Sequence, residues 1–138
     1  MFFKKRTKKE EDNFLIKICA LLIHAAKIDE KYTSKEEKII EKTLIEMGVN
    51  KEDVSKTIEE AKVIEDNSSQ ILDFTKQVKN LSHQDKIKVV EALWSIIYSN
   101  KEADLYETNL MRRLAGLLYI DSKTMGDIKE KIKKENLE

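Results

Sequence analysis

Apolar residues recur at intervals of three and four positions along most of this chain, which is the spacing of one face of an α-helix. No stretch shows a sustained alternation of apolar and polar residues at every second position, which is typical of a half-buried strand. The pattern therefore predicts an all-α protein, a single bundle of about seven helices. The predicted helices run from Asp12 to Ile28, from Ser34 to Gly48, from the residue after Asn50 through Ile64, from Ile71 through Val78, from Ser82 through Ile97, from Asp104 through Leu118, and from Asp121 or Ser122 through Ile132. The third of them carries Val54, Ile58, Ala61 and Ile64 on one apolar face.

Two of the predicted helices are apolar around most of their circumference, and we expect them to lie side by side at the centre of the fold. The first spans 12–28 and the second follows Ser82. Trp94 lies in the second helix, and a core position there would require a hydrogen-bond partner for its indole N–H. In the first helix, Cys19 is interpreted as a small core residue and His24 as a packed or partly exposed side chain.

Residues that favour helix ends stand at several of the predicted boundaries. Ser34 begins a Ser-Lys-Glu-Glu sequence that matches a capping box, and Asn50 and Ser82 are good N-cap residues. Gly48 suits the first position beyond a helix, where the backbone often takes a positive φ. Asp121 is a candidate N-cap for the last helix.

The two halves of the chain resemble each other at a constant offset of 71 residues. Asp29 corresponds to Asn100 at this offset, and Glu36 corresponds to Glu107. Apolar positions that keep the offset are Leu22 and Leu93, Ile39 and Leu110, Ile40 and Met111, Met47 and Leu118, Val49 and Ile120, and Val54 and Met125. We therefore predict two pseudo-repeated three-helix units joined by a short helix, within one domain at 12–134.

The balance of charge argues against a nucleic-acid partner. The chain has 26 basic and 26 acidic residues among 138, whereas nucleic-acid-binding domains normally carry a basic excess. A single cysteine excludes an intrachain disulfide and a CxxC metal or redox site. Because the chain has only three glycines and no Ser/His/Asp, HExxH or phosphate-loop motif, we expect no enzymatic activity.

The residues at 1–11 are basic and then acidic, and we expect them to form a disordered tail. Phe2 and Phe3 lie beside several lysines, which suits peripheral contact with an anionic membrane surface; the alternative is a solvated tail. No apolar run reaches the roughly 18 residues that a membrane span needs, and the tail lacks the apolar core of a secretory signal. We expect a cytoplasmic location, either free or at the inner face of the membrane.

Three segments of the second half resemble the TerB, or tellurite-resistance, family. They are VEALWSIIY at 90–98, Tyr106-Glu107, and LMRRLAGLL at 110–118. They are similar to the family's E-A-L-W helix, acidic turn and L-I-R-R helix, and AKID at 26–29 resembles a first copy of that turn. The resemblance implies an all-helical bacterial domain linked to stress and to metal or oxyanion resistance.

The resemblance also implies that acidic turns between helices hold divalent cations. The candidate ligands are Asp29, Glu36, Asn100 and Glu107, and their oxygen atoms suit Ca²⁺, Mg²⁺ or Mn²⁺. The other interpretation is that these residues form Asx turns and helix caps. The chain has Asn100-Lys101 where the family has Asp-Gly, and the loss of a carboxylate beside a new lysine weakens any site for a hard cation.

Arg112 and Arg113 match the arginine pair of the family motif. One interpretation is that both are surface residues bonded to nearby carboxylates such as Asp104 or Glu107. The other is that they recognise acidic groups of a protein partner, because the planar guanidinium matches a carboxylate. Adjacent helical residues point about 100° apart, so we expect at least one of the two to be available to a partner.

These observations favour a non-enzymatic TerB-like accessory module that acts through protein contacts in a bacterial stress response, such as tellurite or related resistance. The alternative function is a divalent-cation-binding sensor or buffer that uses the acidic turns. The two functions depend on different features of the molecule. Partner binding requires an exposed charged surface, whereas cation binding requires the acidic turns.

Overall fold

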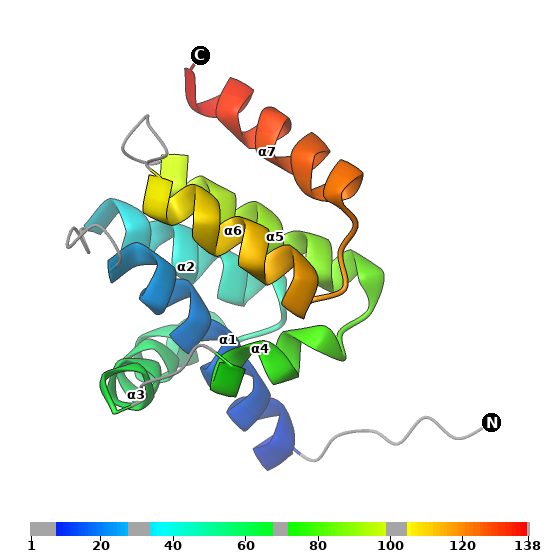
Figure 1. The fold of residues 1–138 in the computed structure, drawn as a ribbon. Helices are drawn as coiled ribbons and strands as arrows, with labels where there is room; N and C mark the ends of the chain where they lie inside the picture. The colour runs from blue at the N-terminus through cyan, green and yellow to red at the C-terminus, as the bar shows by residue number, and fades with distance from the viewer. Residues whose placement is uncertain (1–7, 28–33, 68–71, 99–104, 138) are drawn as a thin grey trace.

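The structure is a computed structural model that describes residues 8–27, 34–67, 72–98 and 105–137. The described part contains seven α-helices and one short 3₁₀ turn, and it contains no strand, which confirms the predicted all-α fold (Figure 1). None of its helices is both long and apolar enough to cross a bilayer. The elements are α1 (Lys8–Lys27), α2 (Ser34–Glu46), η1 (Lys51–Asp53), α3 (Val54–Asp66), α4 (Leu72–Lys79), α5 (His83–Tyr98), α6 (Leu105–Leu117) and α7 (Ser122–Leu137).

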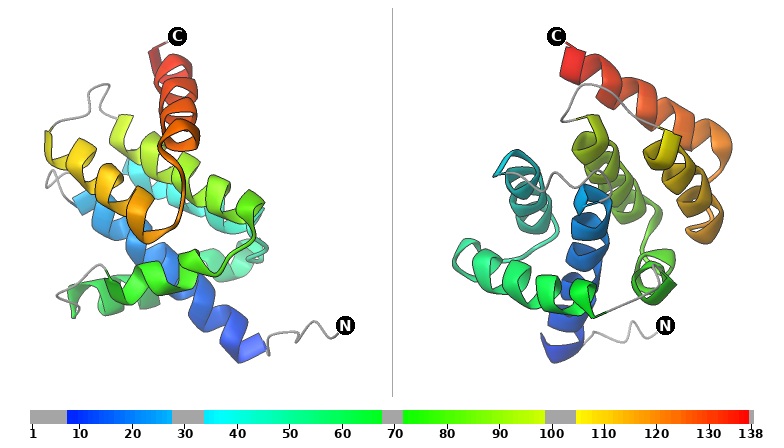
Figure 2. Two further views of the ribbon diagram at one scale, coloured as in Figure 1. Left: turned by 45° about the vertical axis from the view of Figure 1, so that its right-hand side comes forward. Right: turned by 60° about the vertical axis from the view of Figure 1, so that its left-hand side comes forward.

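Helices α1 and α5 form the centre of the fold, as their apolar circumference predicts. Helix α1 contacts α2, α3, α4 and α5, so that it is covered on most sides (Figures 1 and 2). Helix α5 contacts α2, α4 and α7 in addition to α1. The run from Ile18 to Leu22 in α1 is completely buried, because neighbours on every side remove it from water. Removal of these apolar side chains from water stabilises the fold.

Helices α1 and α7 are longer than predicted. Helix α1 begins at Lys8 instead of Asp12, and so takes in the last four residues of the segment predicted as a tail. Helix α7 continues to Leu137 instead of ending near Ile132. The added residues are mostly lysine and glutamate, which favour helix without contributing an apolar stripe. Apolar periodicity alone therefore predicts too late a start for α1 and too early an end for α7.

Two helices end in the same hydrogen-bonded cap. After α2, Gly48 has a φ of 107°, and the N–H of Val49 donates to the carbonyl of Leu44 across 2.9 Å. After α6, Tyr119 has a φ of 56°, and the N–H of Ile120 donates to the carbonyl of Ala115 across 3.0 Å. Both are Schellman motifs. They stand 71 positions apart, the offset at which the sequence pattern repeats, while the duplication itself stays a prediction.

Helix α3 differs from its predicted face and start. Asn50 precedes the 3₁₀ turn and not the α-helix itself, and its side chain makes no capping hydrogen bond. Ile64 was predicted to share the apolar face of this helix, but 36% of it is exposed, whereas Glu65 is only 9% exposed. The buried stripe follows helical spacing through Ala61 to Glu65. A charged residue can take that place because Lys27 and His24 of α1 contact its carboxylate.

The N-caps of α5 and α7 agree with the sequence. Ser82 Oγ accepts a hydrogen bond from the N–H of Asp85 across 3.2 Å. Asp121 Oδ1 accepts one from the N–H of Thr124 across 2.6 Å, and this backbone hydrogen bond lowers the pKa of the Asp121 carboxyl below its ordinary value. The Asp121 cap satisfies one of the backbone donors at the start of α7 that lack a partner within the helix.

Candidate functional site

Trp94 forms the buried base of the region between α6 and α7. It comes from α5 and is 2% exposed. Its ring stacks on Tyr98 with centroids 5.8 Å apart, and its indole Nε1–H donates to the Sδ of Met125 across 3.3 Å. The core position and the need for a partner at the N–H are confirmed, and a methionine sulfur supplies that partner.

Above this base lies an open groove of about 620 Å³, which we call the α6–α7 groove. The left view of Figure 2 shows α6 and α7 diverging from the short turn that joins them. Side chains of both helices, the turn and α5 line the groove: Trp94, Met111, Arg112, Ala115, Gly116, Ile120, Asp121, Ser122, Met125, Gly126 and Lys129. Its base is therefore apolar, and its polar groups lie on the walls and at the turn.

The turn at the closed end of the groove is held by lysines from neighbouring elements. Lys86 of α5 donates from Nζ to the carbonyl of Leu118 across 2.9 Å, which satisfies a carbonyl at the end of α6. Lys79 of α4 places its Nζ 4.8 Å from the ring centre of Tyr119. These contacts and the Asp121 cap stabilise the turn. The walls of the groove thus diverge from an anchored end.

The two arginines of α6 differ in their relation to the groove. Both are exposed, and neither forms an ion pair with a described carboxylate. Arg112 lines the groove, whereas Arg113 does not. On the opposite wall, Lys129 holds its Nζ 5.5 Å from the ring centre of Trp94. Each wall therefore contributes one cation, and Asp121 contributes a carboxylate at the turn.

A family model described as Tellurite resistance protein TerB matches residues 15–130, which is most of the chain. The chain belongs to the TerB family. No curated protein and no solved structure matches it. The segments that resemble the TerB motif include α5 and α6, which supply Trp94 and Arg112 to the groove.

The four residues predicted as TerB cation ligands are only partly within the described structure. Asp29 and Asn100 lie outside the described residues, as does the side chain of Glu107. Glu36 lies in the first turn of α2 and is 1% exposed. Within the described ranges, no group of three or more histidine, cysteine or acidic side chains is placed to hold a metal. The predicted cation site therefore stays a prediction.

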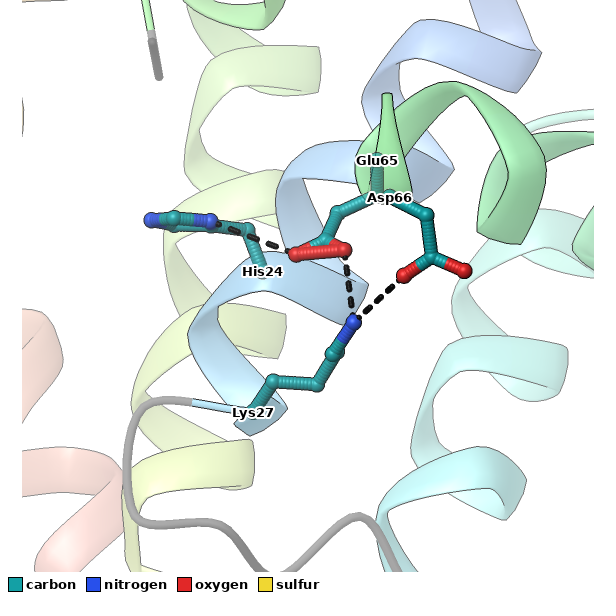
Figure 3. A network of polar contacts seen from close by, with 4 residues as sticks. All are labelled: His24, Lys27, Glu65 and Asp66. Atoms are coloured by element: carbon teal, nitrogen blue, oxygen red, sulfur yellow. Dashed lines mark hydrogen bonds and ion pairs between the residues drawn. The ribbon is translucent and has the colours of Figure 1, made fainter. Parts of the chain in front are cut away.

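A polar network that the sequence did not predict joins the ends of α1 and α3 (Figure 3). Lys27 Nζ lies 2.9 Å from Glu65 Oε2 and 2.8 Å from Asp66 Oδ1, and hydrogen bonds to Asp66 and then Glu65 raise the lysine pKa. His24 Nδ1 lies 3.5 Å from Glu65 Oε1, a contact that is ionic when the imidazole is protonated. The network ties the C-terminal end of α1 to the C-terminal end of α3.

The other residues considered for chemistry have structural positions. Cys19 is fully buried in α1, and burial raises the pKa of its thiol to about 12, so the protonated form dominates at neutral pH. His83 is exposed at the start of α5. The interpretation of Cys19 as a core residue is confirmed.

Proposed function

We propose that this chain is a TerB-like module that binds a protein partner and performs no catalysis, within a stress response of the kind named by its family, tellurite resistance. The observation that carries the proposal is the exposed position of Arg112 and Arg113 without an ion pair to any described carboxylate. One of them stands on the wall of an open groove.

The side-chain environment of these arginines favours recognition of a partner's carboxylates rather than stabilisation of the chain's own fold. An arginine that stabilises its own fold is expected to bond to a carboxylate or to backbone carbonyls. Arg112 and Arg113 make no such contact with the described residues, which leaves their donors unused within that part of the chain. A guanidinium presents five N–H donors in a planar fork that fits a carboxylate with two parallel hydrogen bonds.

The reactive side chains also fit a binding role. Cys19 is buried and its thiol is protonated at neutral pH, which makes it a poor nucleophile. His24 contacts Glu65 in the network between α1 and α3, away from the α6–α7 groove. Neither residue is within the groove where the exposed arginine stands.

Affinity capture from cell lysate tests the proposal. The bait is the full chain, and its matched variant carries Arg112→Ala and Arg113→Ala, with folding verified by circular dichroism. We expect a partner that wild type captures and the variant loses, with capture weakening as salt rises, because exposed charges are screened over about 8 Å at physiological ionic strength. A variant with Lys133→Ala and Lys134→Ala, two exposed cations of α7 outside the groove, controls for the loss of charge. Identical partners for wild type and the arginine variant would contradict the proposal.

A further inference from the structure

Tyr119 has a backbone conformation that favours glycine, and its side chain is largely exposed. It stands in the left-handed position of the cap after α6 with a φ of 56°, whereas the matching position after α2 is Gly48. A residue with a Cβ is strained there, because the Cβ comes close to a carbonyl oxygen. The side chain is 71% exposed, so burial of the ring offsets little of this cost. A strained residue that the fold does not require points to a function for its side chain.

Lysines from three helices surround Tyr119. Lys79 of α4 holds its Nζ 4.8 Å from the ring centre, and Lys86 of α5 holds its Nζ 6.0 Å from it. Lys76 lies one turn before Lys79 on the same side of α4, and Lys123 lies in the first turn of α7. The end of α4, the start of α5 and the turn between α6 and α7 meet at one corner of the molecule (Figures 1 and 2). We call Lys76, Lys79, Lys86, Tyr119 and Lys123 the lysine–tyrosine patch.

The patch carries a local excess of positive charge. Its lysines form no ion pair with a carboxylate in the part of the chain that the structure describes. Asp121 brings a negative charge to the corner, and hydrogen bonding from Thr124 and then the nearby charge of Lys123 lower the pKa of its carboxyl. Asp85 lies 3.8 Å from Lys88, so this pair adds no net charge. The four lysines therefore outnumber the one carboxylate at the turn.

The chemistry of the patch fits the surface of an anionic bilayer. Its cations are all lysines, which are compact charges on flexible stems, whereas arginine suits two-pronged recognition of a single carboxylate or phosphate. Tyrosine is enriched where a membrane meets water, because its ring is apolar and its hydroxyl is polar. Tyr119 protrudes and does not line the α6–α7 groove, although Ile120 and Asp121 do. A protruding tyrosine among lysines matches a flat negative surface better than it matches a single bound anion.

We infer that the lysine–tyrosine patch binds the anionic surface of a lipid bilayer, with the Tyr119 ring at the level of the headgroups. The contact is peripheral, since no helix of the described ranges is long and apolar enough to cross a bilayer. Stable peripheral binding takes two signals, and the basic tail with Phe2 and Phe3 is the second in this chain. The patch does not include Arg112 or Arg113, so lipid binding and partner binding can be lost independently.

Co-sedimentation of the purified full chain with vesicles tests the inference. We expect binding to vesicles of equal parts phosphatidylglycerol and phosphatidylcholine, little binding to phosphatidylcholine alone, and weaker binding as salt rises. The double variant Lys79→Ala and Lys123→Ala should bind about tenfold or more weakly, because each lysine near an anionic surface contributes roughly fivefold. Lys86 is left intact because it caps α6. The variant Lys133→Ala and Lys134→Ala removes the same charge near the other end of α7 and should bind as wild type does.

Substitutions of Tyr119 separate lipid contact from a structural role. Tyr119→Gly suits the positive φ, so it should weaken vesicle binding while leaving the melting temperature close to that of wild type. Tyr119→Trp keeps an aromatic ring suited to the interface, and its fluorescence should shift to shorter wavelength when anionic vesicles are added. Trp94 is buried, so the emission of wild type should not shift. Absence of a shift in Tyr119→Trp would overturn the inference.

Other results would also overturn the inference. One is equal binding to anionic vesicles by wild type and the variant Lys79→Ala and Lys123→Ala. Another is binding that is lost only in Lys4→Ala, Lys5→Ala and Arg6→Ala, because the tail alone would then account for it. A third is stronger displacement from vesicles by sodium phosphate than by sodium chloride at equal ionic strength. That result would indicate a phosphate-specific site, as for a phosphorylated partner, in place of a lipid surface.

Discussion

The indole Nε1–H of Trp94 donates to the Sδ of Met125 across 3.3 Å, and this hydrogen bond ties the central helix α5 to α7. It satisfies the polar atom of a tryptophan that is 2% exposed. Among the described elements, α7 packs mainly on α5, so its position depends on this contact surface. The geometry of the α6–α7 groove therefore depends on how Trp94 packs.

Removal of the Trp94 ring should strongly destabilise the fold. We expect Trp94→Ala to lower the free energy of unfolding by roughly 3–5 kcal/mol, the usual cost of removing a core aromatic side chain. Met125→Leu keeps the volume but leaves the indole N–H unpaired, and should cost about 1 kcal/mol more than Met111→Leu, a buried methionine without that bond. Urea denaturation followed by circular dichroism measures all three, and a loss under about 1 kcal/mol for Trp94→Ala would contradict the packing.

The two Schellman caps should respond differently to substitution. Gly48→Ala forces a Cβ into the left-handed region and should destabilise the fold by about 1 kcal/mol. Tyr119→Gly relieves the same strain but removes the ring that Lys79 and Lys86 contact, so the two effects should offset to within about 0.5 kcal/mol. Thermal and urea unfolding of both variants measure these changes in the free energy of unfolding. A large and equal loss of stability in the two variants would show that the φ of Tyr119 is not strained.

The Asp121 cap should make stability depend on pH in the acid range. The folded-state pKa is below the ordinary value of 3.8, so its contribution is present above pH 3.8 and is lost as the pH falls through the folded pKa. Asp121→Asn keeps a good N-cap without the titration. We expect the advantage of wild type over Asp121→Asn to shrink as urea unfolding is repeated from pH 5 downward. A constant difference across that range would show that this carboxyl is not perturbed.

The network at the ends of α1 and α3 should depend on Glu65 more than on Asp66. Glu65 is nearly buried, whereas Asp66 is exposed, and both bond to Lys27. Glu65→Ala removes a nearly buried carboxylate and its charge-assisted hydrogen bond to Lys27, and should cost about 1–3 kcal/mol. Asp66→Ala removes an exposed ion pair and should cost at most about 1 kcal/mol. Urea unfolding at pH 7 compares them, and the reverse order would contradict the assignment of the buried partner.

Any cation site in the acidic turns should be weak. We expect calorimetric titration with Ca²⁺, Mg²⁺ and Mn²⁺ to show no binding tighter than about 10⁻⁴ M, because Asn100-Lys101 replaces the Asp-Gly of the family pattern. Titration of the Asp29→Ala variant shows how much of the measured heat comes from cation binding at the acidic turns. Micromolar binding that disappears in Asp29→Ala would favour the cation-binding alternative over partner recognition.

The sequence determined the features that depend on neighbours along the chain. Helical periodicity gave the seven helices and the two central ones, and the caps at Gly48, Ser82 and Asp121 were predicted because each bonds to groups within a few residues. Errors arose where a residue's role depends on a distant partner. Glu65 takes a buried position that the apolar pattern assigned to Ile64, because Lys27 and His24 reach it from another helix.

Only the tertiary structure distinguished the two arginines that adjoin each other in the motif. Arg112 lines the groove and Arg113 does not, because adjacent positions of α6 point in different directions and α7 forms the opposite wall for one of them. The open space over Gly116 and Gly126 was likewise invisible in the sequence, since it depends on how far apart two helices diverge. Sequence order fixes which side chains a helix carries, whereas the packing of α6 and α7 on α5 decides which of them share a surface.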